Sequence, residues 1–195
     1  MMHGLIEYAT IFLFVLWISN KIFTNLFIAI LIGACSLYIP LGELTLAQYI
    51  LSYHPSFSFS SCALCGLLVY HQSLDELLLT KKDMKYFLWG NVVLGTTLYL
   101  SSFAIIPFDI YFYGFFFSEW FVVFLVINLF CILLKYNTIF YILLGCIFSF
   151  LMHFGYSPNY FDYLIDPLLF LCCTGILIKN NVVEWFRKKN RSTSS

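Results

Sequence analysis

The chain reads YSPNYFDYLIDP at residues 156–167, a short polar hinge between two strongly apolar runs. The hinge carries Asp162 and Asp166 and contains no basic residue. Because a chain crosses a bilayer only as an element that satisfies its own backbone groups, a polar hinge between two apolar runs indicates a turn at a membrane surface. The rest of the chain repeats this alternation of long apolar runs and short polar breaks.

Composition places the whole chain in a membrane. Hydrophobic residues make up 62% of the sequence and charged residues 10%, whereas ordinary soluble domains carry about 25% charged residues. A water-facing surface cannot be assembled from so few charges. We expect one membrane domain, residues 1–179, with no separate soluble catalytic domain, followed by a basic cytoplasmic tail, residues 180–195.

The apolar runs predict an all-α fold with about seven transmembrane helices. A spanning helix needs about 20 mostly apolar residues. We expect these helices near residues 4–19, 22–39, 57–72, 86–106, 115–134, 138–154 and 164–178. The third has a short apolar core and is the least clear. Residues 40–56 are too polar to cross and too apolar to lie free in water, which indicates an interfacial or re-entrant segment.

The basic residues predict the orientation. With seven crossings, all ten fall on one side of the membrane: Lys21, Lys81, Lys82, Lys85, Lys135, Lys179, Arg187, Lys188, Lys189 and Arg191. Removing the third crossing would move three of these lysines to the other side, so the charge pattern favours seven crossings. The positive-inside rule then puts the C-terminus in the cytoplasm and the N-terminus outside. This fits a bacterial cytoplasmic (inner) membrane and would also suit an endoplasmic-reticulum protein.

The opposite, outer side carries acidic and histidine side chains and no Lys or Arg. Carboxyl groups paired with imidazole are suited to general acid-base catalysis. The candidate catalytic groups are Asp109, Asp162 and Asp166, with His54 and His153 as assisting groups.

The same side could bind a divalent metal, because carboxylate and imidazole groups are common ligands of such ions. The candidate ligands are Glu43, Asp162, Asp166 and His153. No HExxH or HxxxH spacing occurs in the sequence, so the identity of any metal stays open.

The acids also have a structural interpretation. Asp162 and Asp166 stand four residues apart, and on one helix they would share a face, where two carboxylates repel unless a proton, a cation or a hydroxyl intervenes. Alternatively, Asp166 precedes Pro167 in a typical helix start, because Asp caps free N–H groups and Pro fits the first turn. Asp109, which follows Pro107, admits the same interpretation.

Two further features concern the surroundings of the chain. Glu7 and Glu119 lie within predicted helices, where a charge is costly in hydrocarbon, so both are expected to face the bundle interior. The basic tail contains Trp185 and Phe186, and we expect it to bind anionic lipid rather than nucleic acid.

Three functional hypotheses follow. The first is an accessory or interaction subunit of a cytoplasmic-membrane or envelope assembly, in contact with the lipid bilayer and another membrane protein. The second is an intramembrane hydrolase or transferase that acts on a lipid or lipid-linked substrate at the outer leaflet through the acidic and histidine groups. The third is a small transporter, which requires acidic residues deep in the bundle. Convergence of Asp109, Asp162, Asp166 and a histidine in one outer cavity would favour the enzyme.

Overall fold

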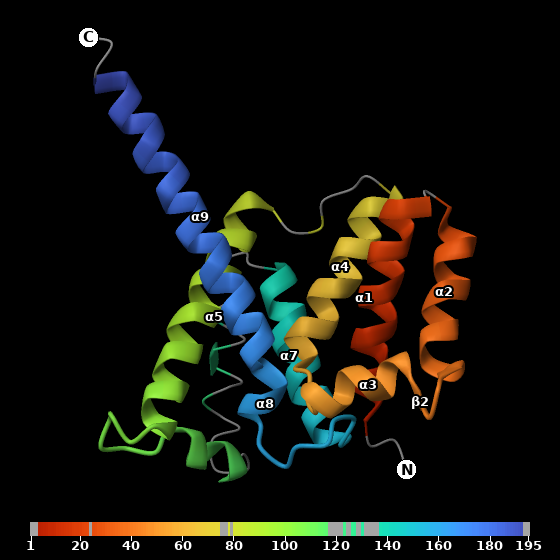
Figure 1. The fold of residues 1–195 in the computed structure, drawn as a ribbon. Coiled ribbons are helices and arrows are strands. Elements are labelled where there is room, and N and C mark those ends of the chain that lie inside the picture. The colour runs from red at the N-terminus through yellow and green to blue at the C-terminus, as the bar shows by residue number, and fades with distance from the viewer. Residues whose placement is uncertain are drawn as a thin grey trace.

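A computed structural model of the chain describes residues 4–23, 25–74, 78, 80–116, 123, 126–127, 130 and 137–192, the last nine of these and residue 137 by their backbone alone. The described chain is mostly helical, which confirms the all-α class (Figure 1). Its elements are α1 Leu5–Phe23, α2 Leu26–Tyr38, β1 Pro40–Leu41, β2 Leu44–Thr45, α3 Leu46–Tyr53, α4 Phe59–Leu74, α5 Lys81–Ser102, the 3-10 helix η1 Tyr111–Phe116, α7 Asn137–Leu151, α8 Phe161–Leu164 and α9 Pro167–Ser192.

The longer helices stand side by side. Helix α1 packs against α2 and α4, α5 packs against α9, and α7 contacts α4. The short helix α3 crosses one end of this bundle, α8 lies at the same end, and the last part of α9 extends beyond the opposite end (Figure 1). Helices therefore occupy most of six of the predicted ranges, whereas the range 115–134 lies mostly outside the described residues.

One described helix, Leu5–Phe23, is long and apolar enough to cross a membrane by its length and composition. Three others are apolar but shorter: Leu26–Tyr38, Thr138–Leu151 and Pro167–Val183. One described helix near the N-terminal end is therefore long and apolar enough to span a membrane, and the total of seven crossings remains a prediction.

The segment predicted to lie at the interface folds as a hairpin followed by α3. Pro40 pairs with Thr45 across the hairpin, and Gly42 supplies the positive φ of 87° that its turn requires. Thr45 and Gln48 then form a capping box, in which each side chain accepts a hydrogen bond from the other residue's N–H group, and this starts α3.

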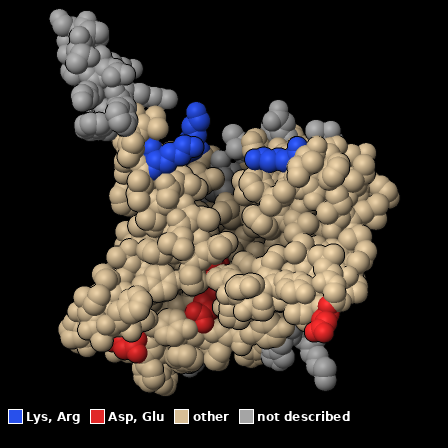
Figure 2. Space-filling model, viewed as in Figure 1, with Lys and Arg blue, Asp and Glu red and all other residues tan. Residues whose placement is uncertain are grey.

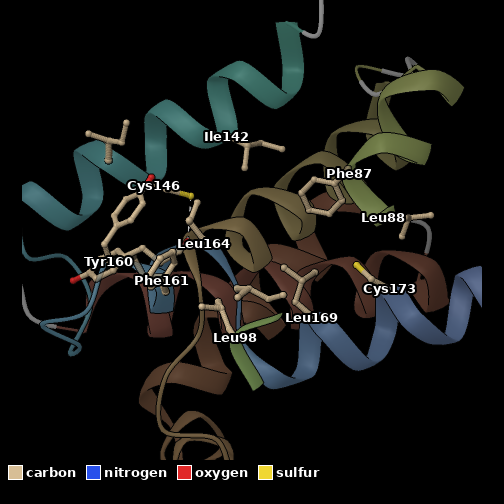
Figure 3. Close-up of a cluster of buried hydrophobic side chains, with 14 of the residues drawn as sticks. Phe87, Leu88, Leu98, Ile142, Cys146, Tyr160, Phe161, Leu164, Leu169 and Cys173 are labelled. Carbon is tan, nitrogen blue, oxygen red and sulfur yellow. Dashed lines mark hydrogen bonds between the residues drawn. The ribbon is translucent and has the colours of Figure 1, made fainter. Parts of the chain in front are cut away.

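The main core lies where α7, α8 and α9 meet α5 (Figure 3). Cys146 of α7 is fully buried there, and its thiol donates to the Tyr163 carbonyl at 3.2 Å. Cys146 and Cys173 are both free and buried, so they pack as small apolar side chains. A smaller cluster of Ile11, Ala47 and Phe57 holds α3 against α1.

Charged side chains lie at the two ends of the bundle, with a broad uncharged zone between them on the face shown in Figure 2. We call the end near α3 and α8 the acidic end and the other the basic end. The acidic end carries Glu7, Glu43, Asp109, Asp162 and Asp166. The basic end carries Lys21, Lys81, Lys82, Lys85 and Lys179, together with one buried acid, Asp83.

Candidate functional site at the acidic end

Asp166 lies at a junction between two helix N-termini. Its Oδ1 accepts the N–H of Leu169 in the first turn of α9 at 2.9 Å. Its Oδ2 accepts the N–H of Ser58 at 2.9 Å, the Ser58 hydroxyl at 2.8 Å and the Ser61 hydroxyl at 2.5 Å. Ser58 immediately precedes α4, and its Oγ accepts the N–H of Ser61 in turn. One carboxylate therefore caps α9 directly and fixes the N-cap serine of α4.

The surroundings of Asp166 favour its charged form. The first N–H groups of a helix lack partners within the helix and form the positive end of its dipole, so an anion is stabilised there. The Asp166 side chain is only 3% exposed, and the Ser61 hydroxyl and the N–H groups of Leu169 and Ser58 donate hydrogen bonds to it.

His54 is the histidine that the structure brings to this carboxylate. It ends α3, and its Nε2 lies 3.5 Å from Oδ1 of Asp166. At this distance Nε2 makes no hydrogen bond within the described part of the chain, so we treat the contact as electrostatic. The ring also packs edge-on against Phe57, with 4.5 Å between the ring centroids.

Asp162 belongs to a second group of side chains. The Tyr111 hydroxyl donates to both of its oxygens, at 3.0 and 2.8 Å, and the Ser157 hydroxyl donates to Oδ2 at 2.5 Å. Burial raises the pKa of Asp162, although these hydrogen bonds oppose the rise. Burial, together with the bond to Asp162 and its charge, also raises the pKa of Tyr111. This group ties η1 to the hinge.

The prediction that Asp162 and Asp166 share a helix face is wrong. Helix α8 ends at Leu164, and Ile165 is extended, with φ −148° and ψ 146°. Asp166 precedes a proline, and such residues are disfavoured in helical conformation, so α8 cannot run on into α9. The two carboxylates consequently bind different partners, and the helix-start interpretation of Asp166 is confirmed.

Asp109 and Glu43 lie on other elements. Asp109 is exposed, and its Oδ1 accepts the N–H of Phe112 at 3.1 Å, so it caps η1 as the alternative interpretation proposed. Glu43 is exposed in the hairpin turn between β1 and β2. Neither is among the groups that bond to Asp162 or Asp166 in the contacts described above.

His153 is exposed just after α7, in a backbone conformation with φ 53°. Across the residues that the structure describes, no group of three or more His, Cys, Asp or Glu side chains is arranged to hold a metal ion. The four candidate ligands therefore do not form such a site within that part of the chain.

The sequence did not single out Ser58, Ser61 or Tyr111, whereas Asn159 is a helix-capping candidate from the sequence. Asn159 is fully buried: its Nδ2 donates to the Tyr111 carbonyl at 2.9 Å and its Oδ1 accepts the N–H of Phe161 at 2.9 Å. Ser58 could have been recognised as a helix cap, because it directly precedes the apolar run of α4. Its partnership with Asp166 spans 108 residues and has no local signal.

Glu7 is buried, as predicted, with 1% of its surface exposed. Its Oε1 accepts the N–H of Tyr156 in the hinge at 3.2 Å. Its Oε2 has no hydrogen-bond partner among the described residues. Glu119 lies outside the described residues.

Comparison of the chain with protein-family models, with curated proteins and with solved structures finds no match.

Proposed function

We propose that the protein crosses the membrane several times, with its acidic end outside and its basic end in the cytoplasm. Large apolar side chains are exposed on the sides of the bundle, among them Phe27 on α2 at 69% and Leu171 on α9 at 66%. Soluble monomers rarely expose extended apolar surface. The zone between the two charged ends supports the same proposal, because lipid hydrocarbon excludes charge.

Within that membrane, we propose that the protein serves as an accessory or interaction subunit of a cytoplasmic-membrane or envelope assembly rather than as an enzyme. The observation that carries this proposal is that the acidic side chains form hydrogen bonds that hold helices and the hinge in place. Asp166 and Asp109 cap helices, and Asp162 accepts hydroxyl donors that hold η1 to the hinge. Carboxylates whose oxygens hold the fold together are poorly placed to transfer protons to a substrate.

The side chains at the two ends of the bundle also suit the proposed orientation in the membrane. Lys179 and the basic residues that follow it in α9 would meet the anionic cytoplasmic leaflet, where each contributes about 1 kcal/mol of attraction. Tyr49 and Tyr53 of α3 are exposed at the acidic end, as suits side chains at the outer headgroup level.

Native mass spectrometry of the protein, extracted from its own membrane in mild detergent, tests the assignment. We expect the parent to retain another membrane polypeptide in fixed stoichiometry and to carry no divalent metal. Asp162→Asn should retain the same partner, and Glu43→Gln is the matched control for loss of an exposed outer acid. A divalent metal that the parent holds and Asp162→Asn loses would contradict the proposal.

A second candidate function rests on one observation. Asp166 and His54 are the two predicted site residues that the structure brings within 3.5 Å, in an arrangement that could orient an imidazole as a general base. This candidate is an outer-leaflet hydrolase or transferase that acts on lipid-linked substrates. Release of headgroups from labelled lipid vesicles by the parent, lost in His54→Gln, would establish it.

A further inference from the structure

Residues 103–110, which we call the α5–η1 loop, project past the end of α5 at the acidic end (Figure 1). Three large apolar side chains of this loop are mostly exposed: Phe103 at 75%, Ile105 at 67% and Phe108 at 68%. Phe112 of η1, which follows the loop, is also exposed. The protein therefore presents large apolar side chains at an end of the bundle, beyond the helix that carries them there.

Buried Ser101 holds the loop in one shape. Its hydroxyl donates to the Phe108 carbonyl at 2.8 Å and accepts the N–H of Ile110 at 2.6 Å, which closes the loop onto the last turn of α5. Asp109 caps η1 through the N–H of Phe112, and η1 is tied to the hinge as described above. A surface that is fixed before it binds loses less conformational entropy on binding.

Lipid hydrocarbon is a poor cover for this loop. Helix α5 ends at Ser102, and backbone outside a helix enters hydrocarbon only where protein or water satisfies its polar groups. The carboxylate of Asp109 is exposed beside Phe108, and a charge is costly at depth in a bilayer. The exposed loop side chains therefore lie at the level of the headgroups or above it, where another polypeptide can cover them.

The charge beside the loop indicates the kind of polypeptide. Every Lys whose side chain the structure describes lies at the basic end, so none of these neutralises Asp109. Buried aromatic anchors contribute most of the affinity of many protein interfaces, and opposite charges across an interface fix its orientation. An apolar pocket bordered by Lys or Arg would complement both Phe108 and Asp109.

We propose that the α5–η1 loop is the surface through which the protein binds its partner, a polypeptide that presents an apolar pocket bordered by Lys or Arg. Phe108 fills the pocket, and Asp109 pairs with the basic side chain at its border. This inference rests on the interaction role proposed above, and it adds the contact surface and the chemistry of the partner.

Native mass spectrometry of the full chain, extracted from its own membrane in mild detergent, tests the surface with three variants. Phe108→Ala should lower the retained fraction of the partner about tenfold or more, as loss of an interface anchor does. Asp109→Asn keeps an oxygen that can cap η1 but removes the charge, so partner retention should become weaker and less sensitive to salt. Tyr53→Ala, the matched control, removes another exposed aromatic side chain of the acidic end and should retain the partner like the parent. Since Phe108 and Tyr53 are exposed, both Ala variants should unfold within a few degrees of the parent.

Photo-crosslinking in intact cells, with p-benzoylphenylalanine in place of Phe108, identifies what covers the loop. We expect a crosslink to the same polypeptide that the parent retains, within an apolar stretch flanked by Lys or Arg. Retention of the partner by Phe108→Ala at the parent's level, or crosslinking to lipid alone, would overturn the binding surface and leave the interaction role standing. A parent that retains no polypeptide would overturn both.

Discussion

Asp166→Ala removes the carboxylate at which the N-termini of α4 and α9 meet. Loss of one helix cap costs about 0.5–2 kcal/mol, and this substitution affects two helices. It also leaves the N–H groups of Ser58 and Leu169 buried without an acceptor, and each such group costs about 1–3 kcal/mol. These costs overlap, so we expect a loss of about 3–5 kcal/mol, the range measured when a buried charged network is broken.

The assay is thermal unfolding of the purified protein in mild detergent. For a chain of this size about 1 kcal/mol corresponds to about 2–4 °C, so the midpoint should fall by roughly 10 °C. Asp166→Asn, which keeps one acceptor oxygen, should lose about half as much. Asp109→Ala is the matched control, because it removes an exposed cap and should cost no more than about 1 kcal/mol. Unfolding midpoints of Asp166→Ala and Asp109→Ala within a few degrees of each other would refute the claim that Asp166 stabilises the N-termini of α4 and α9.

Three further predictions use other contacts. Gly114→Ala should destabilise the fold by about 2–4 kcal/mol in the same assay, because a Cβ there would overlap the Asn159 side chain; Gly90→Ala, with no atom in the way, should be neutral or stabilising. Ser61→Ala should cost about 1.5–3 kcal/mol, since it removes a hydrogen bond to a charged group, and equal stability of parent and variant would refute this. The pKa of Asp162 is raised above its ordinary 3.8, so its contribution to stability is complete below pH 3.8 and is lost as pH rises through the raised value. Unfolding of parent and Asp162→Asn across that window should show the parent losing stability relative to the variant, and a constant difference would contradict the raised pKa.

The sequence predicted the elements of this fold better than their contacts. Long apolar runs bounded by polar residues locate helices such as α1 and α5, because the length and polarity of a run can be read from neighbouring residues. Asp166 before Pro167 likewise signals a helix start from two adjacent residues. Such signals are local, and the chain need not be folded for them to be recognised.

The site depended on information that is not local. Ser58 and Asp166 meet because α4 and α9 bring their N-termini to the same end of the bundle, and nothing in either segment specifies the other. The helix-face hypothesis for Asp162 and Asp166 used their spacing and overlooked the effect of Pro167 on the residue before it. His54 reaches Asp166 only because α3 crosses the acidic end, and a single sequence does not show where a short amphipathic helix docks.

The measurement that most directly tests the proposed architecture is the side of the membrane on which each end of the bundle lies. Glu43→Cys places a thiol in the exposed hairpin turn at the acidic end, and Lys82→Cys places one at the basic end. Labelling in intact cells with a membrane-impermeant maleimide, scored above the level of the parent, should modify Glu43→Cys and should modify Lys82→Cys only after the membrane is permeabilised. Labelling of Lys82→Cys in intact cells, or recovery of the protein in the soluble fraction, would contradict a membrane-crossing bundle with its acidic end outside.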